Sequence, residues 1–122
     1  MLIVALLNQA VLAQAVDWAQ WRGPTRDGIL PAKGLALTQL PNQPRVVWKI
    51  KSGEGLSSPV VTDGTVFHFE NRGGKETMVA LSAMDGSQKW STSLAPVFED
   101  GQGPRGPRCT PCLLYTSPSP RD

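Results

Sequence analysis

The alternation of short β-rich runs with glycine turns between residues 58 and 94 constrains the fold more than any other feature of this chain. The runs that resemble strands are residues 58–62, 65–70, 77–81 and 89–94. Asp63-Gly64 and Asp85-Gly86 suit tight turns, and the polar residues 71–75 form a loop between the middle two runs. Four antiparallel strands with short connections make a meander, the unit of a β-propeller blade. The sequence therefore predicts an all-β fold with one complete four-stranded antiparallel blade.

Length and composition agree with this prediction. A chain of 122 residues has room for one modest core. Its 12 glycines and 11 prolines make nearly a fifth of the residues, which favours short strands and many turns over long helices. The net charge is only +2, and no basic stripe is present to follow a phosphate backbone. We therefore expect no nucleic-acid binding.

A weak internal repeat extends the pattern on both sides of the blade. Trp48 and Trp90 lie 42 positions apart, and each is expected to close an outer strand. A small-small-Pro step follows each tryptophan, at residues 57–59 and again at residues 109–111. The second gap is ten residues longer, as a loop insertion would make it. We expect residues 45–50 to be an outer strand of the last blade that closes the ring, a strand that removes an exposed sheet edge.

The N-terminal residues predict a secreted protein. Residues 2–7 are apolar but too few to span a bilayer, and Ala13-Gln14-Ala15 fits the small-x-small pattern of a cleavage site. Residues 1–15 are therefore interpreted as a signal peptide, and the protein as secreted or periplasmic without a membrane span. No Lys or Arg precedes Arg22, so a hydrophobic N-terminal strand remains the alternative. Residues 16–44 follow as an irregular leader that docks by the rings of Trp18 and Trp21.

The last eleven residues, 112–122, break with everything before them. They show neither strand alternation nor the repeat, and they resemble the in-frame translation of a transposase-type sequencing adapter. We treat them as a non-native tail and exclude them from the fold. Cys109 and Cys112 have the C-x-x-C spacing of a redox motif, but they lack its strand-to-helix setting, and the second cysteine belongs to the tail. The spacing is interpreted as an accident of the junction.

Two segments carry a resemblance to a known family. Residues 80–90 resemble the tryptophan-docking motif of quinoprotein-type propellers, of the general form Ala-x-Asp-x-x-x-Gly-x-x-x-Trp. Residues 17–28 are similar to the N-terminal signature of secreted pyrroloquinoline-quinone-like repeat proteins. Met84 separates Ala83 from Asp85, so the aspartate comes one place later than in the common motif, and Gly86 lacks the preceding Thr. The resemblance implies that residues 45–111 begin a quinoprotein-like β-propeller.

The resemblance implies one of two functions. Some family members are scaffolds that bind or assemble partners, and we expect this function, with a protein partner or small ligand on the propeller face. The alternative is the first blade of a quinone-dependent dehydrogenase, which would bring pyrroloquinoline quinone and calcium. These residues contain no adjacent cysteine pair and no assignable Glu, Asn and Asp ligand set. We therefore assign no catalytic, cofactor-binding or metal-binding residue and expect no chemistry in this part of the chain; whether the whole protein is an enzyme stays open.

A few residues carry competing interpretations. His68, the only histidine, is interpreted as a packed or edge residue of a strand, with a ligand or general base as the alternative. The Gly-Pro loop of residues 98–108 is interpreted as a connector, with an anion-binding surface formed by its arginines as the alternative. Glu99 and Asp100 are adjacent and suit acid–base work poorly. Trp48 and Trp90 are interpreted as structural.

Overall fold

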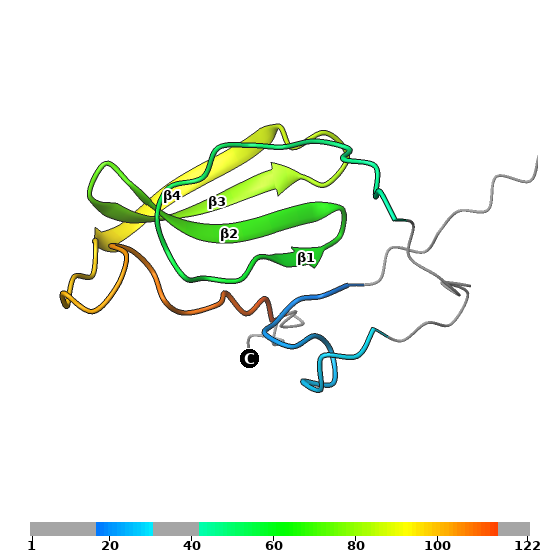
Figure 1. The fold of residues 1–122 in the computed structure, drawn as a ribbon, viewed down its shortest axis with the longest axis horizontal. Coiled ribbons are helices and arrows are strands. Elements are labelled where there is room, and N and C mark those ends of the chain that lie inside the picture. Colours follow the sequence, from blue (N-terminus) through cyan, green and yellow to red (C-terminus); the bar gives the residue numbers. More distant parts are fainter. Residues whose placement is uncertain (1–16, 31–41, 115–122) are drawn as a thin grey trace, which may run out of the picture.

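The protein is all-β, with one four-stranded antiparallel sheet. The computed structural model describes residues 17–30 and 42–114, so the predicted signal peptide, part of the leader and most of the predicted tail lie outside the described residues. The strands are β1 (Val60–Thr62), β2 (Thr65–Arg72), β3 (Lys75–Ser82) and β4 (Gln88–Pro96), in the order β1-β2-β3-β4 (Figure 1). The described residues contain no helix, and the sheet is not closed. The predicted meander is thus confirmed.

Two-residue glycine turns join the first three strands. Asp63 and Gly64 have φ values of 45° and 63°, and Gly73 and Gly74 have 61° and 80°, the left-handed region that tight hairpin turns require. The predicted polar loop of residues 71–75 is therefore wrong in its extent. Asn71 pairs with Glu76 and Arg72 with Lys75, so these polar residues extend the ladder rather than leave it.

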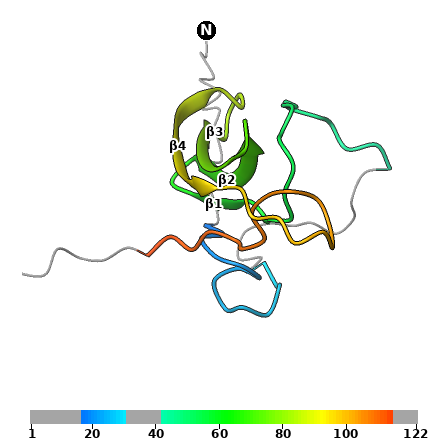
Figure 2. The same ribbon diagram turned by 90° about the vertical axis from the view of Figure 1, so that its left-hand side faces the viewer.

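Two irregularities interrupt the pairing of β3 with β4. Ala80 pairs with Trp90 but Leu81 pairs with Gln88, which leaves Lys89 without a partner in the ladder. A second register shift between Glu76 and Thr77 leaves one further residue of β4 unpaired. Bulges of this kind bend a strand and increase its twist, and Figure 2 shows the sheet strongly curled.

The alternation of side chains gives the sheet two different faces. One face carries Val66, His68 and Glu70 of β2 beside Val79 of β3, and a segment of the chain crosses it. We call this segment, residues 45–56, the strap; it passes across the strands in Figure 1 and lies on one side of the curled sheet in Figure 2. The opposite face carries the half-buried side chains of Phe67, Phe69 and Met78 and the exposed Trp90, and we call it the open face.

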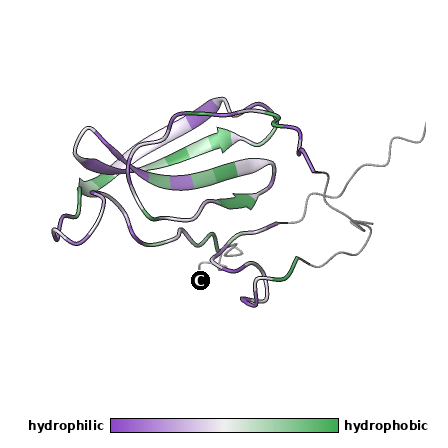
Figure 3. Ribbon diagram, in the orientation of Figure 1, coloured by the Kyte–Doolittle hydropathy of each residue, from purple (hydrophilic) through white to green (hydrophobic). Residues whose placement is uncertain are grey.

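The core is small and divides between the two faces of the sheet: Val79 and Leu81 lie on the face that the strap crosses, and Val60 and Ala80 lie on the open face beside Phe67. Val60, Val79 and Ala80 are at most 1% exposed and Leu81 is 4% exposed. Within the sheet, Figure 3 shows strong hydrophobic colouring on β1 and on the C-terminal part of β3. All nine residues of β4 are exposed, so this strand contributes ladder hydrogen bonds more than buried surface.

The strap is the one place where the predicted strand does not form. Residues 45–50 adopt no strand, because the described part of the chain provides no strand beside them with which to pair. The strap is held instead by side-chain contacts to β2 and to the loop between β3 and β4. Only at its end does it meet the edge of β2, where the Asn71 amide donates to the Glu54 carbonyl at 2.8 Å.

The leader docks on β1 through its backbone. Trp18 exchanges two hydrogen bonds with Val61, of 2.6 and 2.9 Å, and the carboxylate of Asp17 accepts the Asp63 amide at 3.0 Å. The sequence predicts docking by aromatic rings, and this is not what the structure shows. The Trp18 ring packs on Gly23 within the leader itself, and Trp21 is 61% exposed.

Candidate functional site

The closest contact between the strap and the sheet is a seat for Trp48. Its indole Nε1 donates to the Ala83 carbonyl at 2.9 Å, and its ring covers Gly86. A Cβ at Gly86 would lie 2.8 Å from the indole, so only glycine fits beneath the ring. Gly86 also has φ = 72°, which glycine adopts at the least cost. We call Ala83 and Gly86 the Trp48 seat.

The seat belongs to the loop that the sequence motif singles out. The Ser82 and Gly86 amides close this loop by donating to the Ser87 and Ser82 carbonyls, at 2.8 and 2.9 Å. The carboxylate of Asp85 accepts the Ser87 amide at 3.0 Å and the Ser87 hydroxyl at 2.7 Å, and these bonds hold the pKa of Asp85 below its usual value. The aspartate thus fixes the loop while the glycine leaves room for Trp48.

The two copies of the small-small-Pro step lie side by side. The Ser58 amide donates to the Thr110 hydroxyl at 3.3 Å, and the Leu56 amide donates to the Pro107 carbonyl at 2.9 Å. Gly106 packs against the Glu54 backbone so closely that a Cβ there would contact it at 3.0 Å or less. Segments that follow Trp48 and Trp90 in the sequence therefore run next to each other in space.

Trp90 itself has no seat like that of Trp48 within the described residues. It is 46% exposed on the open face, where its ring meets Phe67 at a centroid distance of 5.8 Å and an interplanar angle of 56°. The bulge beside it lets Lys89 reach across β3 to the Thr65 hydroxyl at 2.6 Å. Among the described residues, Trp90 thus has a ring contact with Phe67 and leaves nearly half of its surface exposed.

A buried carboxylate holds the strap to β2. Glu70 is 3% exposed, and its Oε2 accepts the Gly53 amide at 2.7 Å and the Ser52 hydroxyl at 3.0 Å. Its Oε1 accepts Arg72 Nε at 2.7 Å. Burial would raise the pKa of Glu70, but the hydrogen bonds from Gly53, Ser52 and Arg72 outweigh it and hold the pKa below its usual value. We call these four residues the clasp.

His68 lies on the same face as the clasp, two residues before Glu70. It is half-buried, and its Nε2 is shielded from solvent without a hydrogen-bond partner in the described part of the chain. Burial lowers the pKa of His68, Glu70 raises it and Arg72 lowers it, with a net shift below the usual value. The structure shows a packed strand histidine and no partner that would make it a general base.

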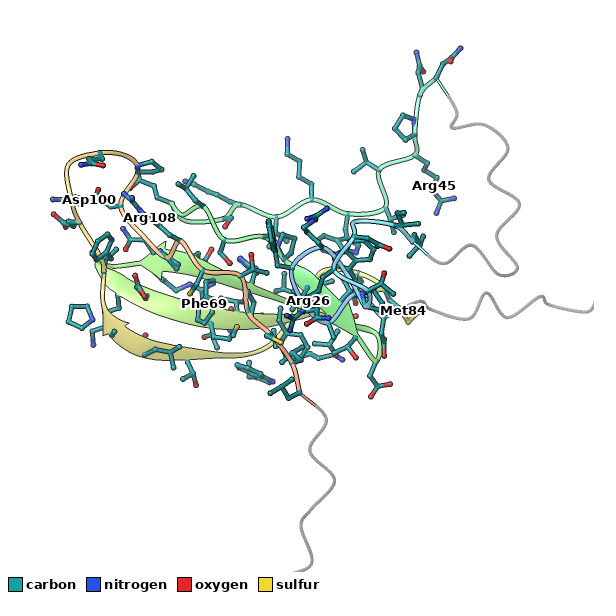
Figure 4. The ribbon with its side chains drawn as sticks, turned by 90° about the horizontal axis from the view of Figure 1, so that it is seen from below. Arg26, Arg45, Phe69, Met84, Asp100 and Arg108 are labelled. Atoms are coloured by element: carbon teal, nitrogen blue, oxygen red, sulfur yellow. The ribbon has the colours of Figure 1, made fainter. Side chains whose placement is uncertain are left out.

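The arginines of the loop of residues 98–108 are occupied by acidic residues of the same loop. Arg105 pairs with Glu99 at 2.9 Å and Arg108 with Asp100 at 2.6 Å, and Figure 4 shows Asp100 beside Arg108. Arg108 also lies over the ring of Phe98, 5.3 Å from its centroid. These contacts favour the connector over the anion-binding surface, because both guanidinium groups already have an anion.

The remaining candidate groups are the two cysteines and the possible metal ligands. Cys109 and Cys112 are both free and exposed, and Cys112 contacts Gln20 only at 3.9 Å from Sγ to Oε1. Over residues 17–30 and 42–114, no group of three or more His, Cys, Asp and Glu side chains is placed to hold a metal ion. The described residues therefore provide no calcium ligand set, and we derive no step of a quinone reaction from them.

Sequence reasoning identifies the Asp85-Gly86 turn but misses both the Trp48 contact on it and the clasp. In the sequence, Glu70 is the polar last residue of a predicted strand. Its separation of 18 and 17 positions from Ser52 and Gly53 matches no known local pattern, so the sequence does not predict the contact. The signal that is present is Gly53, which has no turn of its own to explain it. A Cβ at this position would overlap the Asn71 carbonyl oxygen, so Gly53 marks a close approach of two backbones.

Comparison with known proteins adds no relative. No protein-family model, no curated protein and no solved structure matches this chain. None of the described residues forms a helix long and apolar enough to cross a membrane.

Proposed function

We propose that the chain is the start of a secreted β-propeller that serves as a binding or assembly scaffold. The observation that carries this proposal is the Trp48 seat. A tryptophan from outside the four-stranded sheet packs on its Gly86 loop, so the sheet receives a contact from a preceding unit. Trp90, 42 positions later, is exposed where a following unit would receive it.

The neighbouring backbone contacts support successive units of one kind. Ser58 precedes β1, and Thr110 occupies the corresponding place after β4, where it accepts the Ser58 amide. In a propeller, the first strands of neighbouring blades run side by side around the axis. Under this proposal, residues 45–50 complete the last blade once that blade is present, and the open face packs on the second.

The hydrogen bonds and ion pairs of the acidic side chains favour a scaffold over an enzyme. The carboxylates of the clasp, of Asp85 and of the loop of residues 98–108 are all engaged in hydrogen bonds or ion pairs that hold the backbone. Such groups stabilise a rigid surface rather than react. A partner protein or a small ligand on the propeller face is the expected binding function.

Sequencing the gene across and beyond the Pro111 codon tests the architecture. A propeller predicts further four-stranded units, each with a tryptophan about 40 positions after the preceding one. A reading frame without such units would overturn the proposal.

Titration of the encoded full-length protein with pyrroloquinoline quinone and calcium tests the scaffold function. We expect no bound quinone absorbance and no dye reduction. Stoichiometric quinone binding with dye reduction would replace the scaffold by a quinone-dependent dehydrogenase.

A further inference from the structure

Two titratable side chains of β2 lie next to each other on the face that the strap crosses, and the scaffold contacts do not require either to be titratable. Glu70 is buried and ties the strap to the sheet through Ser52 and Gly53. His68 points from the same face, and its inaccessible Nε2 has no acceptor among the described residues. A protonated imidazole there would place a second N–H in a site that offers it nothing to bind.

The charged surroundings of His68 are few. On β2 they are Glu70 and Arg72, which respectively favour and oppose its charged form. The neighbouring rows of β3 and β4 present uncharged side chains on this face, and β1 adds none. The strap brings four exposed charged residues, namely Arg45, Lys49, Lys51 and Glu54. The cations outnumber the anions around His68, so the surroundings do not offset the cost of burying its charge.

The strap has few other attachments to the sheet. Besides the clasp, these are the bond from Trp48 to Ala83 and the bond from Asn71 to Glu54. The sheet, in contrast, is held by a continuous ladder in which β2 and β3 pair over eight residues. Loss of the clasp therefore affects the strap before it affects the strands.

We propose that the strap is an acid-released latch: protonation of His68 and of Glu70 lifts residues 45–54 from the sheet while β1–β4 stay paired. An open strap gives the imidazolium of His68 access to water. A neutral Glu70 keeps one weak acceptor but loses its ion pair with Arg72 and its charge-assisted bond from Gly53.

The pH at which each contribution starts to be lost follows from the ordinary pKa of each group and the direction of its shift. The pKa of His68 is lowered from 6.5 in the folded protein, so its contribution is complete above pH 6.5 and is lost as the pH falls from there toward the lowered value. The pKa of Glu70 is lowered from 4.5, so its contribution is complete above pH 4.5 and is lost as the pH falls through the lowered value. The contribution of His68 therefore starts to be lost at a higher pH than that of Glu70.

Amide hydrogen exchange by NMR on the 122-residue chain, from pH 7 to pH 3, tests the proposal. The reporters are the amides of Gly53 and Asn71 and the indole N–H of Trp48, each with its rate corrected for the intrinsic effect of pH. We expect these three to lose protection at least about tenfold over this range, while the β2–β3 ladder amides keep theirs. Equal and simultaneous loss across strap and ladder, or unchanged protection of the strap down to pH 3, would overturn the latch.

Two variants separate the contributions. His68→Gln, which does not titrate, is expected to move the onset of strap opening to lower pH, and an unchanged onset would remove His68 from the mechanism. Glu70→Gln is expected to leave the three strap reporters weakly protected already at pH 7. Glu76→Gln is the matched control, because Glu76 lies on the open face and should leave the wild-type profile unchanged. The wild-type profile decides the proposal on its own if a variant fails to fold.

Discussion

Glycine is required at position 86 for two reasons: the backbone there is left-handed, and the Trp48 ring occupies the space that a side chain would need. An alanine there would adopt φ = 72° and press its methyl group against the indole of Trp48. We expect Gly86→Ala to lower the free energy of unfolding by about 2–3 kcal/mol, of which about 1 kcal/mol comes from the backbone alone. Urea denaturation followed by circular dichroism measures the loss.

Gly64 separates the two effects. It has φ = 63°, but no heavy atom lies within 4 Å of the place that an added methyl group would take, so Gly64→Ala has the backbone cost without the clash. We expect it to lose about 1 kcal/mol. Equal losses for the two variants would show that the Trp48 ring does not rest on Gly86 in solution.

The indole nitrogen of Trp48 contributes separately from its ring. Trp48→Phe keeps an aromatic ring on the strap but deletes the donor to the Ala83 carbonyl. We expect a loss of about 1–2 kcal/mol from the hydrogen bond and the smaller ring. A loss below about 0.3 kcal/mol, measured in the same urea titration, would mean that the strap is not seated.

The sequence alone predicts only part of the Trp48 seat and of the clasp. Asp85-Gly86 indicates a turn, because the backbone preferences of these two residues are local. That Trp48 covers this glycine, and that Glu70 binds Ser52 and Gly53, depends on how the strap crosses the sheet. Such contacts between distant residues leave little trace in one sequence.

At the scale of elements, the strands differ in how completely they are held. β3 pairs on both sides and contains Val79, Ala80 and Leu81 of the core, whereas β4 is exposed along its whole length and carries two bulges. We expect the central β3 amides to exchange at least about tenfold more slowly than those of β4 that bond to β3. Native-state hydrogen exchange at pH 7 measures both; comparable protection would show that another layer covers β4.

The sequence predicts where the strands lie more accurately than where they begin and end. Alternating apolar residues with β-branched neighbours mark the middle of each strand, so the sequence predicts all four. It does not predict the ends, because Asn71, Arg72 and Lys75 are polar and resemble a loop until their ladder partners are known. The strap shows the opposite error, since residues 45–50 have strand-like residues but no strand beside them.

At the scale of the whole molecule, the prediction that residues 112–122 are a non-native tail can be tested by itself. Residues 112–114 add one backbone bond, from the Leu113 amide to the Ala19 carbonyl at 2.9 Å, and pair with no strand of the sheet. A chain ending at Pro111 is therefore expected to keep the sheet, with the free energy of unfolding changed by less than about 1 kcal/mol. Backbone chemical shifts of β1–β4 check this.

A second truncation serves as the control. Removal from residue 106 onward deletes the buried Gly106, Pro107 and Pro111 and leaves the Leu56 amide without its carbonyl partner. We expect it to destabilise the protein by several times as much as the first truncation. Equal effects of the two truncations would show that residues 106–111 do not pack against the strap.

The close approach of Gly53 to β2 has a use in searching for chains with the same contact. A side chain at position 53 would strike the Asn71 backbone, and Glu70 and Arg72 complete the contact. A serine-glycine pair, followed 17 positions after the glycine by Glu-x-Arg, is therefore a compact query for other genomes. Sequences too divergent to align along their length but with this spacing and the Trp48–Gly86 pair would be candidates for the same strap-to-sheet contact.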